Sequence, residues 1–230
     1  MRVLAIDTSS NVATVAVMED ELLLGEYILN HKKTHSQKIM TMIEQILSEL
    51  ELTVRDIDIF AAAIGPGSFT GLRIGVATVK ALAHATGKPV VSVGTLEALA
   101  YNVPYAEHII VDARRDNVFT ASYIWDEGFK EIGEPEAISI DECLESCGEF
   151  LDTIFVGDGV KVHREYIKEK LGDKAIFPPA NALNSRASSV AALALDKAKR
   201  GETQSYLEMK PYYIRKSQAE RELEERENKE

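Results

Sequence analysis

The first residues that could do chemistry form a turn, Asp7-Thr8-Ser9-Ser10, directly after a short apolar run. An aspartate at the end of a strand can help to hold a metal–nucleotide, and the N–H groups and hydroxyls of the following turn can bind phosphate. Such a turn normally contains a glycine, because glycine lets the backbone approach the phosphate closely. Here Ser9 and Ser10 stand instead. The turn is therefore either a degenerate nucleotide site or a turn that Asp7 only orders.

The second candidate is the block from Gly65 to Gly75, which reads Gly-Pro-Gly-Ser-Phe-Thr-Gly-Leu-Arg-Ile-Gly. A glycine-rich loop before a helix can bind phosphate, but this block lacks the Gly-Lys-Ser/Thr ending of a P-loop. Gly67, Gly71 and Gly75 are four residues apart, which places them on one helix face and allows another helix backbone to approach closely. The spacing favours a packing or partner surface over catalysis.

No other motif provides a nucleophile or a metal site. The sequence lacks His-Glu-x-x-His, Gly-x-Ser-x-Gly and Ser-x-x-Lys patterns. Cys143 and Cys147 lie in a polar stretch with no further metal ligands arranged beside them. We expect two incidental thiols in a reducing compartment.

The elements that would position these residues follow from the hydrophobic pattern. In chain order it predicts three strands within residues 2–30, a helix capped by Thr34, a strand over 57–64, a helix over 72–86, a strand over 90–93 and a helix capped by Thr95 that runs to Tyr101. Three antiparallel strands extended by parallel crossovers are the layout of a ribonuclease H-like fold, the building block of actin-like ATPases.

A second copy of this pattern begins about a hundred residues later. The apolar run from His108 ends at Asp112, as the first run ends at Asp7, and a polar turn and a second strand follow each. We also expect a strand over 153–156 that ends in Gly157-Asp158-Gly159, and helices near 162–171 and 185–199. The predicted architecture is α/β, with two ribonuclease H-like lobes of the actin-like ATPase (ASKHA) superfamily. The lobes span residues 1–103 and 104–215, and a charged tail spans 216–230.

The first predicted helix carries a wider apolar stripe than one core requires. Its apolar positions sweep an arc of about 160°, whereas a helix that faces one core needs about 100°. Either the helix is sandwiched inside the monomer, or part of the stripe is an interface beside the glycine-stepped helix. The candidate interface positions on the first helix are Ile39, Met40, Met42, Ile43, Ile46 and Leu47.

The charge balance excludes some partners. The 230 residues include 26 Lys and Arg against 37 Asp and Glu, a formal net charge of −11. A chain that grips nucleic acid or an anionic membrane by itself needs clustered positive charge. We expect no targeting leader, and no apolar run is long enough to cross a bilayer. We expect a cytoplasmic protein without membrane contact.

Several blocks together resemble the TsaB (YeaZ) family. They are Leu4–Ser9, His35–Gln37, Gly65–Gly75, Asp112–Arg114 and Pro211–Glu220. In bacteria this family is the partner of TsaD, which transfers the threonylcarbamoyl group from threonylcarbamoyl-AMP to the N6 amine of the adenosine beside the tRNA anticodon. The ATPase TsaE belongs to the same complex.

The resemblance implies a catalytically silent scaffold with the same two-lobed fold and no cofactor of its own, so that ATP and metal belong to the TsaD and TsaE partners. TsaD-like proteins carry a metal-binding histidine pair where residues 93–100 here have none, and Arg114 stands where nucleotide-binding relatives have glycine. The remnants of a nucleotide site would be Asp7, Thr8, Ser9, Asp112, Gly157 and Gly159.

The resemblance also implies a partner surface on the first-lobe helices. It would comprise the six stripe residues together with Gly67, Gly71, Arg73 and Gly75. The isolated chain would pair with itself through this surface, and tRNA would be contacted only through the partner. Two alternatives remain open at this point: a small actin-like kinase or ATPase that uses Mg-ATP with Asp7 and Asp112, and a plain homodimeric binding module.

Overall fold

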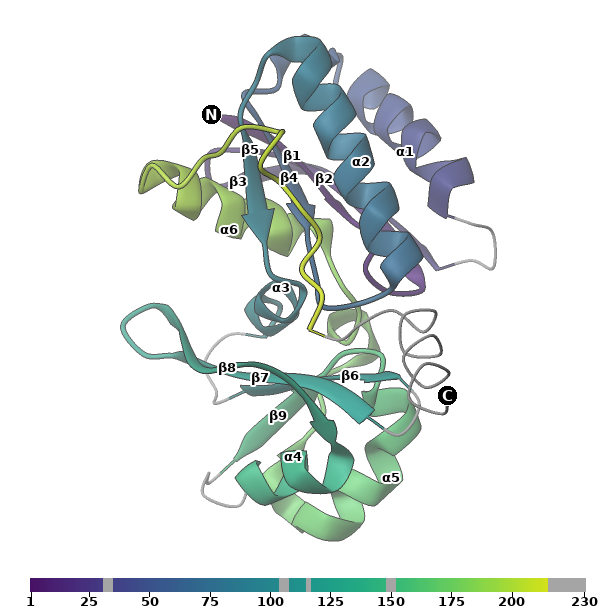
Figure 1. Ribbon diagram of the computed structural model, residues 1–230, viewed down its shortest axis with the longest axis vertical. Helices are drawn as coiled ribbons and strands as arrows, with labels where there is room; N and C mark the ends of the chain where they lie inside the picture. Colours follow the sequence, from purple (N-terminus) through teal and green to yellow (C-terminus); the bar gives the residue numbers. More distant parts are fainter. Residues whose placement is uncertain (31–34, 104–107, 115–116, 148–151, 215–230) are drawn as a thin grey trace, which may run out of the picture.

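A computed structural model describes residues 1–30, 35–103, 108–114, 117–147 and 152–214 of the chain. Its first lobe is built on a five-stranded sheet with the order β3-β2-β1-β4-β5 (Figure 1). The elements of this lobe are β1 (Arg2–Asp7), β2 (Val12–Glu19), β3 (Leu22–Asn30), α1 (His35–Glu49), β4 (Ile59–Ala63), α2 (Phe69–Thr86), β5 (Val90–Val93), α3 (Thr95–Tyr101) and α6 (Ala187–Lys199).

The second lobe repeats this layout. Its sheet order, β8-β7-β6-β9-β10, places three antiparallel strands beside two parallel ones, as in the first lobe. Its elements are β6 (His108–Arg114), β7 (Asn117–Trp125), β8 (Phe129–Ser139), α4 (Ile140–Ser146), β9 (Thr153–Val156), α5 (Val160–Leu171) and β10 (Ala175–Ile176). The predicted duplication of a ribonuclease H-like unit is therefore confirmed.

The central strands of the first sheet are buried on both faces. Side chains alternate along β1, so that Leu4 and Ile6 pack toward α1 and α2 while Val3 and Ala5 pack toward α6. Helices cover both faces of the sheet (Figure 1). Strands in such a sheet read as continuous apolar runs, which is why β1 and β4 were recognisable from sequence.

The wide stripe of α1 is explained within the monomer. Five of its six positions are at most 7% exposed: Ile39, Met42, Ile43, Ile46 and Leu47. The helix contacts β2 and β3 on one side and α2 on the other, so it needs a wider apolar arc than a helix with one neighbour. The prediction that these five side chains form a partner surface is therefore wrong. Only Met40, at 45% exposure, lies at the surface.

The chain returns to the first lobe after the second one. Helix α6 packs Val190, Ala191 and Leu195 against the first sheet. The segment that follows, residues 200–214, continues over the first lobe, where the backbone N–H of Tyr212 donates to the carbonyl of Ile64 at 2.7 Å. The predicted second lobe of 104–215 therefore extends too far, because α6 and the described part of this segment belong to the first lobe. The predicted tail, 216–230, and the predicted cap Thr34 lie outside the described residues.

Three local predictions also change. Helix α2 begins at Phe69, three residues earlier than expected, with the Ser68 hydroxyl as its cap. The cap of α3 is Gly94, whose N–H donates to the Glu97 carboxylate at 3.1 Å, and Thr95 is the first helical residue. The glutamate-rich segment from 127 to 149, for which no element was expected, contains β8 and α4.

The two cysteines are core residues of the second lobe. Cys143 and Cys147 are 0% and 1% exposed and both are free thiols, although the sequence around them is polar. The hydrogen bond between the two thiols lowers the pKa of Cys143 and raises that of Cys147.

Among the helices of the described ranges, none combines the length and the apolar character that crossing a membrane requires.

The position of α6 leads to a stability prediction. Leu195→Ala removes a buried side chain from the layer between α6 and the first sheet, and we expect the free energy of unfolding to fall by about 2–5 kcal/mol. Leu207→Ala is the matched control, since Leu207 is 67% exposed, and it should change stability by less than about 0.5 kcal/mol. Urea denaturation of both variants measures this difference. Equal stability of the two variants would contradict the assignment of α6 to the first-lobe core.

Candidate functional site

The turn after β1, residues 7–9, is closed to solvent. Asp7, Thr8 and Ser9 are each at most 1% exposed. The Asp7 carboxylate accepts the backbone N–H of Ser9 at 2.7 Å, and the Thr8 hydroxyl donates to the carbonyl oxygen of Gly71 at 2.7 Å. The backbone N–H of Ser68 donates to the carbonyl oxygen of Ser9, also at 2.7 Å. The bond of Asp7 closes the turn on itself, and the bonds of Thr8 and Ser68 hold the turn against the start of α2.

The glycine steps of α2 face this turn. A Cβ atom added at Gly71 would lie 2.0 Å from the carbonyl oxygen of Thr8, and one at Gly67 would lie 2.6 Å from that of Ser9. At Gly75 it would lie 2.5 Å from the Thr8 hydroxyl. The spacing correctly indicated a close backbone approach. The approaching backbone, however, is the turn after β1 of the same chain, so the assignment of these three glycines to a partner interface is wrong.

Arg73, the remaining predicted interface residue of α2, is exposed. Its Nε donates to the Tyr213 hydroxyl at 3.0 Å. Phe69 and Tyr213 are stacked with ring centroids 4.3 Å apart, and the Arg73 guanidinium lies about 6 Å from both rings. This stack joins the first turn of α2 to the segment after α6. Only the aromatic pair Tyr212-Tyr213 hinted at it in the sequence.

The outer face of α2 carries small side chains. Thr70, Ala77 and Ala81 are exposed, and Ile74 and Thr78 are half-buried between them. These positions recur every three or four residues, so they share one helical face. This face was not predicted from the sequence, where the regular spacing of the glycines indicates only the opposite, buried side of the helix.

The second-lobe candidates lie across the junction between the lobes. The loop Gly157–Gly159 joins β9 to α5. Its Asp158 lines a cavity of about 310 Å³ with Lys161 and Asn184, opposite Ser10, Asn11 and Asn30 of the first lobe. The Lys161 ammonium donates to the Asn184 side-chain oxygen at 3.4 Å. The structure thus brings this loop toward the turn after β1, but Ser10 and Asn11 line the cavity rather than Asp7.

Asp112 lies outside the turn after β1, within strand β6 of the second lobe, where it pairs with Phe119 of β7. Within the described part of the chain, no group of three or more His, Cys, Asp and Glu side chains is arranged to hold a metal ion.

Two duplicated lobes around a junction define an α/β protein with the ASKHA fold. The (R)-2-hydroxyglutaryl-CoA dehydratase component A from Acidaminococcus fermentans shares this fold with a TM-score of 0.54 at 11% identity, covering 86% of this chain and 99% of that one. At this identity the likeness concerns the fold alone.

Closer similarities define the family. The family described as "TsaD: tRNA N6-adenosine threonylcarbamoyltransferase" matches residues 23–223. The Bacillus subtilis protein named "tRNA threonylcarbamoyladenosine biosynthesis protein TsaB" is 32% identical over 225 residues, which cover 96% of each chain. The solved structure of YeaZ from Pseudomonas aeruginosa has a TM-score of 0.79 at 25% identity, and the match covers 92% of this chain and 99% of that one. The chain belongs to the TsaB (YeaZ) family.

The contact between α2 and the turn predicts that replacing one helical glycine by alanine destabilises the protein instead of stabilising it. In a helix interior, replacing glycine by alanine normally stabilises by about 1 kcal/mol. At Gly71 the added methyl group would collide with the Thr8 carbonyl, so we expect Gly71→Ala to destabilise by about 1–3 kcal/mol. Thr8→Val, which removes the bond to Gly71, should cost about 1 kcal/mol. Denaturant titration measures both, and a stabilised Gly71→Ala variant would refute the close approach.

Proposed function

We propose that this chain is an accessory, non-catalytic subunit in the synthesis of threonylcarbamoyladenosine on tRNA. In this proposal it binds a TsaD-like catalytic subunit and acts with a TsaE-like ATPase. The complex transfers the threonylcarbamoyl group from threonylcarbamoyl-AMP to the N6 amine of the adenosine beside the anticodon. Similarity to the Bacillus subtilis TsaB protein over nearly the whole chain supports this role.

The closed turn after β1 is the observation that carries the non-catalytic part of the proposal. A nucleotide phosphate at this turn would have to displace α2, break the bonds from Thr8 and Ser68, and free the Asp7 carboxylate from Ser9. Each buried polar group left without a partner costs about 1–3 kcal/mol. The alternative of a Mg-ATP-dependent kinase based on Asp7 and Asp112 is therefore disfavoured, and ATP and metal are assigned to the partners.

The outer face of α2 supports the docking part of the proposal. Its small side chains, with Ala77 and Ala81 at its centre, allow the backbone of a partner helix to come close, by the same steric logic that governs small-residue helix pairs. Met40 and Arg73 are the two residues of the original interface prediction that lie at the surface. In the absence of a TsaD-like partner, a second copy of the chain would occupy the same face.

The charge of the chain fits a partner that holds the RNA. With a formal net charge of −11, the isolated protein gains no counterion-release free energy from clustered cations, which is the main source of affinity for a phosphate backbone. In this proposal tRNA is contacted only through the complex.

The docking proposal predicts the effect of a charge on the outer face of α2. Ala77→Glu and Ala81→Glu place a carboxylate on an exposed helix surface, so the monomer should keep its circular dichroism spectrum and its unfolding midpoint. Binding to a TsaD-like protein should weaken at least tenfold, because the carboxylate would be desolvated without a partner. Val162→Glu is the control, since Val162 is 71% exposed on α5 of the other lobe.

Co-purification and a reconstituted transfer assay with TsaD-like and TsaE-like proteins measure these effects. The wild type and Val162→Glu should support threonylcarbamoyl transfer to tRNA, and the two α2 variants should not. Full binding and activity of both α2 variants would refute this docking face.

A further inference from the structure

Among the residues that the structure describes, none pairs with the outer edge of the first sheet at β3. Edge strands expose unpaired N–H and C=O groups, and proteins usually cover them or mark them with charge or proline. The opposite edge strand, β5, is covered: the backbone groups of Val90 and Gln204 exchange two hydrogen bonds of 3.0 and 2.9 Å. In the second lobe the edge strand β8 carries Lys130, Glu131, Glu134, Pro135 and Glu136.

Strand β3 has neither form of protection. Over its nine residues Glu26 is the only charged one, and three large aliphatic side chains are exposed: Leu22, Leu23 and Ile28, at 64%, 40% and 49%. Glu26 does not place a charge at the exposed edge, because its side chain is only 6% exposed and is turned toward α6. There it accepts hydrogen bonds from Arg186 and from the N–H and hydroxyl of Ser188. An apolar edge of this length is a place where another strand can pair.

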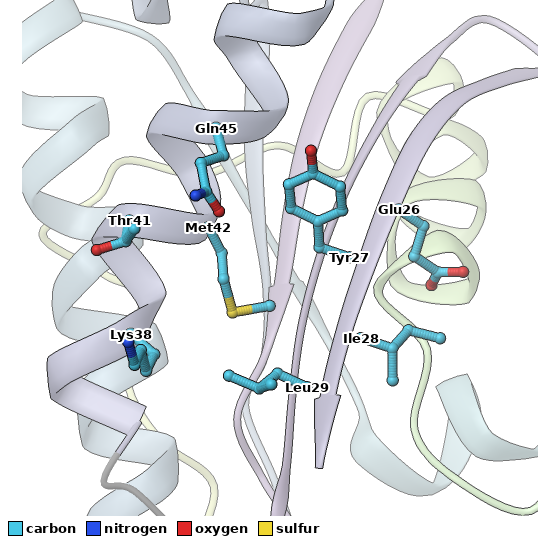
Figure 2. A pocket seen from close by; sticks show the side chains of 8 residues that line it. All are labelled: Glu26, Tyr27, Ile28, Leu29, Lys38, Thr41, Met42 and Gln45. Carbon is cyan, nitrogen blue, oxygen red and sulfur yellow. The ribbon is translucent and has the colours of Figure 1, made fainter. Parts of the chain in front are cut away.

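A groove of about 690 Å³ runs between this edge and α1. Figure 2 shows Tyr27 and Leu29 projecting from β3 toward α1, and Met42 projecting back toward the strand. These three side chains form an apolar floor. The α1 side of the groove is completed by Lys38, Thr41 and Gln45. A strand edge beside a side-chain pocket is the geometry of strand addition, in which backbone bonds give affinity and alternate side chains give specificity.

The charge of the groove narrows the choice of occupant. Among the described residues that line it, Lys38 is the only cation, and the single carboxylate, Glu26, is already neutralised by Arg186. The groove therefore complements a segment with an acidic side chain. A second copy of this chain lacks the complementary charge, because the described residues that line its own groove offer Lys38 and no unpaired carboxylate.

We propose that the groove between β3 and α1 binds an extended segment of a partner protein, which adds a strand to the edge of the first sheet. The segment places aliphatic side chains on Tyr27, Leu29 and Met42 and an acidic side chain beside Lys38. This site is separate from the outer face of α2 and does not depend on the role proposed for that face.

The test uses a defined probe with the full-length protein. The probe is a capped nine-residue peptide in which valine alternates with threonine and the central valine is replaced by glutamate, so that the glutamate shares a face with the remaining valines. We expect saturable binding by fluorescence anisotropy and slower hydrogen exchange of the β3 amides. Lys38→Glu should weaken binding at least tenfold, and a peptide with lysine in place of the glutamate should recover that loss. Lys168→Glu, the same charge change at an exposed residue of the second lobe, should bind as the wild type does.

Changes in the peptide keep the test independent of protein folding. N-methylation of the peptide amides along one edge should abolish binding to the wild type, because strand addition depends on those N–H groups. The proposal is overturned if the glutamate peptide does not bind, if the N-methylated peptide binds equally well, or if Lys38→Glu and Lys168→Glu have the same effect. It is equally overturned if light scattering shows a dimer of the wild type that Ile28→Lys abolishes, since the groove would then hold a second copy.

Discussion

Thr8 donates its hydroxyl proton to the carbonyl oxygen of Gly71, while a methyl group on Gly71 would lie 2.0 Å from the carbonyl oxygen of Thr8. Only glycine permits an approach this close, and the approach recurs four residues away in both directions, at Gly67 before the helix and at Gly75 within it. The contact fixes where α2 runs relative to β1. It also uses the polar groups of the turn in which an actin-like fold would receive a phosphate.

The remaining surfaces follow from this placement. With its glycine side occupied by the turn, α2 presents its small outer residues to solvent, and its first turn is joined by the Phe69–Tyr213 stack to the returning chain. The returning segment covers β5, whereas no described residue pairs with the opposite edge of the sheet, β3, beside α1. The fold thus uses the turn after β1 for internal packing, and the outer face of α2 and the β3 edge are the two surfaces that we propose for other molecules.

Much of the fold was predictable because the hydrophobic period reports local burial. The apolar runs of β1 and β4 and the repeated strand–aspartate pattern led directly to two related lobes. What the sequence could not supply was the identity of neighbours. The stripe of α1 has the same residues whether a partner or α2 covers its flank, and Gly71 has the same spacing whether it meets a helix or a turn. Arg73 meets Tyr213 across 140 residues of chain, a pairing that no local pattern indicates. The sequence around Cys143 is rich in charged residues, so it did not indicate that one face of α4 is buried in the core of the second lobe.

Hydrogen exchange at the backbone amides of Ser9 and Ser68 tests the closed turn most directly. These N–H groups donate to the Asp7 carboxylate and to the carbonyl oxygen of Ser9. If the turn is a permanent packing element, both amides exchange only through openings with a free energy near that of global unfolding, and millimolar Mg-ATP leaves their rates unchanged. Rapid exchange that slows when Mg-ATP is added would mean that the turn opens to receive a nucleotide. That result would contradict the claim that the turn serves only packing and takes no part in the chemistry.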